Sequence, residues 1–107
     1  MILLLGGAHP APGTTTPAGE ALLRLEATRV DDVLAAAREG QARRVVAQLP
    51  AVGLNVFSLA RALRRAGGPP LVLVGPLRRD QRFWAERNGG AWVERLEDAL
   101  GDEVPAP

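Results

Sequence analysis

Residues 44–48 have the sequence Arg-Val-Val-Ala-Gln, and residues 49–55 continue as Leu-Pro-Ala-Val-Gly-Leu-Asn. The apolar run is short and ends before a segment with proline and glycine, which is typical of a strand buried on both faces. Asn55 is a residue type that often caps a helix, and apolar residues recur at helical spacing after it. These residues are Val56, Leu59, Ala60 and Leu63. The stretch therefore predicts a strand, a loop and a helix, the repeating unit of an α/β fold.

The same alternation extends in both directions along the chain. Further strands are predicted at residues 2–5, 71–74 and 91–93, and further helices at residues 30–40, 78–88 and 96–100. Thr28 is the predicted cap of the helix that ends at Gly40. In residues 21–27, leucines alternate with charged side chains, which favours an edge strand. A helix beginning at residues 16–17, with threonine before proline, is the alternative for this segment.

This order of elements predicts a three-layer α/β fold with a five-stranded parallel sheet and helices on both faces. Five strands in a chain of 107 residues favour the flavodoxin-like order 2-1-3-4-5, which also places the second strand at an edge. The three prolines of residues 8–19 disfavour a helix, so the first helix is expected to be shortened or replaced by a loop. Residues 1–107 are expected to form one domain, with residues 102–107 as a frayed tail.

Composition excludes several kinds of chemistry. Without cysteine the chain has no disulfide or thiolate site, and one histidine cannot form a multi-histidine metal site. All 13 basic residues are arginine, so Schiff-base chemistry and lysine phosphate clamps are excluded. The scarcity of Ser, Asn, Gln and Met favours a thermophile source. No apolar run is long enough to cross a membrane and the start differs from a signal peptide, so we expect a cytoplasmic protein.

Two stretches resemble the receiver domain of bacterial response regulators. Residues 26–40, which run from Glu-Ala-Thr to Arg-Glu-Gly, are similar to the second helix of that family, and Arg44-Val45-Val46-Ala47-Gln48 is similar to its third strand. The resemblance places Gln48 at the phosphoacceptor aspartate, Gly6 and Gly7 at the acidic pair that binds magnesium, and Gly75 at the phosphate-sensing Ser/Thr. Arg95 lies near the family's lysine if a one-residue gap is allowed.

These replacements remove the chemistry that the resemblance would imply. An amide cannot accept a phosphoryl group as a carboxylate does, and it attracts a divalent cation less strongly. The resemblance therefore implies a pseudo-receiver with no catalytic residue, metal or cofactor. Such a domain would act in signal transduction or scaffolding as a phosphorylation-independent protein-interaction module.

The loop after the first strand offers an alternative function. Residues 8–15 have the spacing of a phosphate-binding P-loop, but Thr14 stands where the lysine belongs. With His9, Gly13 and Thr15, this loop would serve a flavodoxin-like protein that binds a small molecule or nucleotide. The simpler interpretation is an ordinary Pro/Thr loop with one loop histidine. An accessory subunit of a larger enzyme is a third hypothesis.

A partner-binding face is predicted from Arg82, Phe83, Trp84 and Trp92. Receivers commonly dock partners, or a second copy, through their fourth helix, fifth strand and fifth helix, and aromatic residues beside arginines are typical of interface hot spots. The alternative is that the indoles of Trp84 and Trp92 both complete the core. We expect an unidentified protein partner, or a homodimer. No nucleic acid or membrane partner is expected, because carboxylates are interleaved with the arginines and the net charge is only +1.

Overall fold

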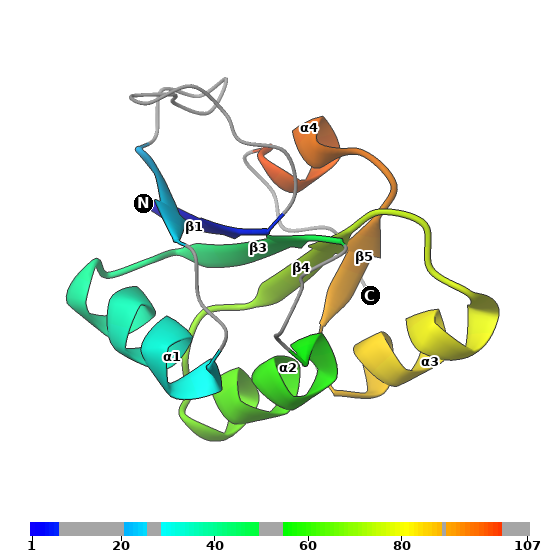
Figure 1. The fold of residues 1–107 in the computed structure, drawn as a ribbon, viewed down its shortest axis with the longest axis horizontal. Coiled ribbons are helices and arrows are strands. Elements are labelled where there is room, and N and C mark those ends of the chain that lie inside the picture. The colour runs from blue at the N-terminus through cyan, green and yellow to red at the C-terminus, as the bar shows by residue number, and fades with distance from the viewer. Residues whose placement is uncertain (7–20, 26–28, 50–54, 89, 102–107) are drawn as a thin grey trace.

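The computed structural model describes residues 1–6, 21–25, 29–49, 55–88 and 90–101 (Figure 1). Within them, five parallel strands form one sheet in the order β2-β1-β3-β4-β5. The strands are β1 (Ile2–Leu5), β2 (Leu22–Leu25), β3 (Arg44–Gln48), β4 (Leu71–Val74) and β5 (Ala91–Val93). The helices are α1 (Val30–Glu39), α2 (Val56–Arg65), α3 (Arg79–Arg87) and α4 (Leu96–Ala99). The predicted α/β class, strand order and flavodoxin-like topology are confirmed, and β2 is an edge strand rather than part of a helix.

The sheet separates two layers of helices. Helices α1, α2 and α3 cover one face, and the short α4 lies on the other (Figure 1). Because strand side chains alternate between faces, Leu3 and Val45 belong to the larger core under α1 to α3, whereas Leu4 and Val46 belong to the smaller core with α4. Both faces of the central strands are therefore buried, as their continuous apolar sequences predicted.

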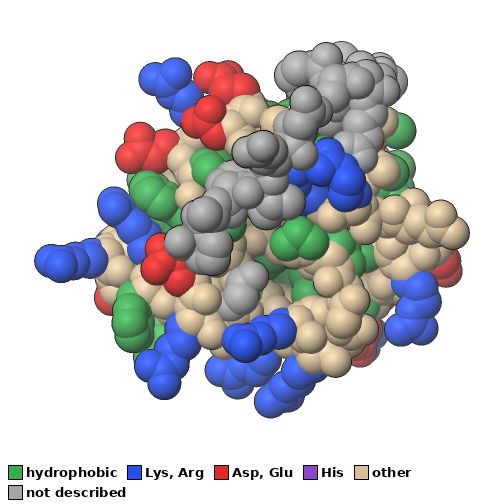
Figure 2. All heavy atoms as spheres, turned by 180° about the vertical axis from the view of Figure 1, so that it is seen from behind, with side chains coloured by type: hydrophobic (Ala, Val, Ile, Leu, Met, Phe, Trp, Pro, Cys, Tyr) green, Lys and Arg blue, Asp and Glu red, His purple; other side chains and the backbone are tan. Residues whose placement is uncertain are grey.

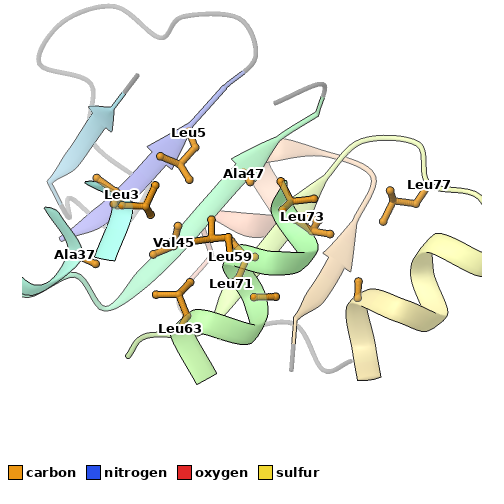
Figure 3. Packing of buried hydrophobic residues seen from close by; sticks show 14 residues of the cluster. Leu3, Leu5, Ala37, Val45, Ala47, Leu59, Leu63, Leu71, Leu73 and Leu77 are labelled. Carbon is orange, nitrogen blue, oxygen red and sulfur yellow. The ribbon is translucent and has the colours of Figure 1, made fainter. Parts of the chain in front are cut away.

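Helix α2 forms as its sequence predicted. The Oδ1 atom of Asn55 accepts hydrogen bonds from the backbone N–H groups of Phe57 and Ser58, both at 3.1 Å. The four apolar residues of the predicted stripe are all buried. Figure 3 shows Leu59 and Leu63 over the strands of the larger core. This packing fixes the position of α2 on the sheet, and with it the outer surface that α2 shares with α3.

The N-terminal end of α1 differs from the prediction, whereas its C-terminal end agrees with it. The N-cap residue is Arg29, whose side chain makes no capping hydrogen bond, so the predicted cap at Thr28 is wrong by one residue. Thr28 itself lies outside the described residues. At the other end Gly40 is the C-cap but has helical backbone angles, and Gln41 takes the positive φ of 51°. The helix therefore ends at Gly40 as predicted, and the left-handed residue that follows it is Gln41 rather than a glycine.

Two predicted segments lie outside the described residues. They are the loop expected in place of the first helix, within residues 7–20, and the tail at residues 102–107. In the part of the chain that is described, no helix has the length and apolar character needed to cross a membrane.

Arg44 is completely buried at the start of β3. Its Nη1 atom donates hydrogen bonds to the backbone carbonyl of Ala99 at 2.6 Å and to that of Gly101 at 2.8 Å. These carbonyls lie at the end of α4, where a helix leaves acceptors without partners inside the helix. A guanidinium group therefore joins the central strand to the helix on the smaller face, a role that the sequence did not reveal.

Candidate functional site

The carboxyl ends of β1, β3 and β4 lie side by side at one end of the sheet, which we call the carboxyl edge. Ligands bind at this end in folds of this type. Leu5 pairs with Ala47, and Gln48 pairs with Val74. The residue after each of β1 and β4 is a glycine, Gly6 and Gly75 respectively. The fold therefore brings Gly6, Gln48 and Gly75 together, whereas Gly7 lies outside the described residues.

Gln48 presents an amide to this edge. It is two residues beyond Val46, so its side chain lies on the face that carries the smaller core. The residue is half-buried, and its Oε1 atom is fully buried without a hydrogen-bond partner in the described part of the chain. A buried acceptor without a partner has a desolvation cost of about 1–3 kcal/mol. This atom is therefore a candidate contact for a donor from a ligand or water.

Gly75 has a backbone conformation that a serine or threonine would not adopt easily. Its φ is 133°, and a Cβ built there would lie 3.3 Å from the Cβ of Leu49. Its carbonyl accepts a hydrogen bond of 2.6 Å from Nε1 of Trp92. The position therefore differs from a phosphate-sensing hydroxyl site in backbone conformation as well as in side chain.

The other residues predicted for this end of the sheet are either exposed or outside the described residues. Arg95 is the N-cap of α4, its side chain is 76% exposed, and its Nη1 atom lies 3.7 Å from a carboxylate oxygen of Glu97. The residues His9, Gly13, Thr14 and Thr15 of the predicted ligand loop lie outside the described residues. Among the described residues, no three His, Asp or Glu side chains are placed to hold a metal ion.

Phe83 and Trp84 lie on the outside of α3. They are 55% and 51% exposed, so the indole of Trp84 does not complete the core as the alternative required. The two rings meet edge to face, with centroids 6.0 Å apart, and the guanidinium carbon of Arg87 is 5.9 Å from each ring centre. An adjacent aromatic pair with an arginine beside it is a common composition for a protein interface.

Trp92 lies against the larger core, unlike the exposed Phe83 and Trp84. It is half-buried, packs against the larger core and donates its indole hydrogen bond to Gly75. The guanidinium carbon of Arg82 lies 4.2 Å from the centre of its ring. Arg82 and Trp84 are two residues apart on α3, which places them about 160° apart around the helix axis. The four residues of the predicted face therefore divide between two sides of α3, with Trp84 toward α2 and Arg82 toward β5.

A groove of about 310 Å³ lies between α2 and α3, beside Trp84. Its lining comprises Phe57, Arg61, Arg78, Asp80, Gln81, Trp84 and Asn88. Two of these lining residues are in contact, because Nε of Arg61 donates a hydrogen bond of 3.4 Å to Oδ1 of Asn88. Sequence reasoning missed the contribution of α2, although Phe57 carried a weak signal as an aromatic residue outside the buried stripe of that helix.

Comparisons of the chain with family models, with curated proteins and with solved structures found no match. The fold and the geometry of its two candidate sites are therefore the basis for a functional proposal.

Proposed function

We propose that this chain is a non-enzymatic pseudo-receiver that acts in signalling or scaffolding by binding another protein, independently of phosphorylation. The observation that carries the proposal is the exposure of Phe83 and Trp84 side by side on α3. Large aromatic side chains in water are costly for a soluble domain, and they recur at the centres of protein interfaces.

The chemistry of the carboxyl edge supports the non-enzymatic part of the proposal. Phosphoryl transfer to a receiver needs a carboxylate nucleophile and a magnesium ion held by further carboxylates. Here the corresponding positions carry Gln48 and Gly6, and Gly75 has no hydroxyl group. The described part of this edge therefore has an acceptor amide and backbone groups but no nucleophile.

Incubation with acetyl phosphate and magnesium tests this proposal. We expect the intact mass of the protein to remain that of the unmodified chain. We also expect the Gln48→Asp variant to stay unmodified, because a carboxylate restored at residue 48 alone still lacks the acidic pair that binds magnesium. An active receiver domain treated in parallel provides the positive control. Phosphoryl incorporation into the wild-type chain, released by hydroxylamine as from an acyl phosphate, would contradict the proposal.

A second candidate function is binding of a small molecule or nucleotide at the carboxyl edge. The observation that favours it is the buried Oε1 atom of Gln48, which has no partner among the described residues. A ligand that binds only the native state raises the free energy of unfolding, and with it the melting temperature. At a free ligand concentration of one hundred times the dissociation constant, the gain in the free energy of unfolding is about 3 kcal/mol.

A thermal-shift panel of nucleotides and small metabolites measures this effect. If the second candidate is correct, at least one compound raises the melting temperature of the wild-type protein and loses most of that effect on the Gln48→Met variant. A panel without any response at millimolar concentrations counts against this candidate and leaves the docking proposal in place.

A further inference from the structure

Arginines gather on α2 and α3. These two helices and their capping residues contain Arg61, Arg64, Arg65, Arg78, Arg79, Arg82 and Arg87, but only two carboxylates, Asp80 and Glu86. Since the net charge of the whole chain is +1, the rest of the chain is net acidic. Figure 2 shows arginine side chains along the lower and left edges of the molecule, where α2 and α3 lie when Figure 1 is turned round. The chain is therefore electrically polarised, with its basic side on these two helices.

Most of this positive charge is not neutralised within the described structure. Of the seven arginines, only Arg78 makes an ion pair there, with Asp80 at 3.3 Å, and both side chains are largely exposed. Arg64 donates instead to a neutral group, the backbone carbonyl of Arg87, at 3.3 Å. Arg61 likewise contacts the amide oxygen of Asn88. A guanidinium group that is hydrogen-bonded only to a neutral acceptor keeps its positive charge and has further N–H donors, so it can still pair with a carboxylate of a partner.

The groove supplies an apolar centre for this basic side. Phe57 and Trp84 contribute aromatic surface, and Arg61 and Arg78 lie at the same groove. A volume of about 310 Å³ is at the lower end of the range of ligand pockets, about 300–1,000 Å³, so the groove suits one or two side chains better than a large cofactor. An apolar centre with charged groups around it is the usual arrangement of a peptide-binding interface.

We propose that the α2–α3 surface, defined by Phe57, Arg61, Arg64, Arg78, Trp84 and Arg87, binds an acidic segment of a partner protein. An aromatic or aliphatic side chain of that segment occupies the groove beside Trp84, and flanking carboxylates pair with the arginines. This inference rests on the proposed function, and it names the chemistry of the partner.

Charge also decides against a second copy of this chain. A symmetric homodimer through this surface would bring two copies of the same basic surface together, and like charges in contact destabilise a complex. An acidic peptide with an apolar residue satisfies both the groove and the charge.

Selection of random short peptides on the immobilised full chain tests the inference. Peptides retained by the wild-type protein are counter-selected on the Trp84→Ala variant, whose fold is checked by circular dichroism. We expect the peptides that bind the wild-type protein but not the variant to carry Asp and Glu around one Leu, Phe or Trp. The affinity of a synthesised example should fall about thirtyfold for Trp84→Ala, as for other interface hot spots, and should weaken as salt is raised.

Charge reversal provides a second variant and its control. Arg61→Glu should weaken binding of the peptide substantially. Arg29→Glu makes the same charge change at an exposed residue before α1 and should leave the affinity for the peptide nearly unchanged. Selection that yields no peptide, or peptides without an acidic excess, would overturn the inference. So would a single-stranded oligonucleotide that binds with the same dependence on Trp84 and Arg61. Failure here leaves the phosphoryl assay unaffected, and phosphoryl incorporation with peptide binding intact would refute only the proposed function.

Discussion

Replacement of Arg44 by methionine is expected to lower the free energy of unfolding by about 3 kcal/mol. Methionine fills much of the same space but cannot donate to the carbonyls of Ala99 and Gly101, which then lose their partner at the end of α4. These acceptors belong to the backbone and cannot be removed with the arginine, so the usual gain from replacing a whole buried polar pair does not apply. The loss corresponds to a melting temperature lower by more than about 10 °C for a domain of this size.

Thermal unfolding followed by circular dichroism measures this effect. The matched control is Arg65→Met, because Arg65 is exposed on α2 and its replacement should change stability by less than about 0.5 kcal/mol. An Arg44→Met variant as stable as the wild-type protein would mean that the two carbonyls are satisfied by solvent and that α4 does not depend on Arg44.

Replacement of Gly75 by serine is expected to lower the free energy of unfolding by about 2 kcal/mol, although serine is a residue that the receiver family carries at the corresponding position. The φ of 133° is strained for any residue with a Cβ, and the new Cβ would be 3.3 Å from that of Leu49. Relief of this strain requires rotation of the backbone, which moves the carbonyl that accepts the indole hydrogen bond of Trp92. The substitution should therefore alter the indole N–H resonance of Trp92 as well as the melting temperature.

Gly101→Ala is the control for this substitution. A Cβ at Gly101 would have no atom within 4 Å, and its φ is outside the left-handed region, so little change in stability is expected. If Gly75→Ser is as stable as the wild-type protein and leaves the Trp92 resonance in place, the edge can accept a hydroxyl group without strain. Gly75 would then differ from the family only in its side chain.

The sequence predicted the sheet because its signals were local. Apolar runs of three or four residues identified β1, β3 and β4, and Asn55 with the stripe after it identified α2. The start of α1 was less accurate, because its N-cap is Arg29, whose side chain makes no capping hydrogen bond, and not the predicted Thr28. Residues with a strong conformational preference therefore predicted the elements better than their exact ends.

The features that depend on distant residues were not predictable in the same way. Arg44 looks like the solvated end of a strand, and only the position of α4, 55 residues later at Ala99, makes it a buried donor. The groove likewise joins Phe57 to Trp84 across two helices. Periodicity identifies the buried face of each helix but not the neighbour that meets its flank, so the predicted face combined residues from two sides of α3.

The most direct measurement is an amide chemical-shift map of the wild-type protein, recorded first with magnesium and beryllofluoride and then with a selected acidic peptide. We expect the phosphoryl mimic to leave Gly6, Gln48 and Gly75 unchanged, and the peptide to shift resonances of α2 and α3, including the indole N–H of Trp84. Shifts at the carboxyl edge with the phosphoryl mimic, together with an α2–α3 surface that the peptide leaves unchanged, would contradict the proposal of a docking module without phosphoryl chemistry.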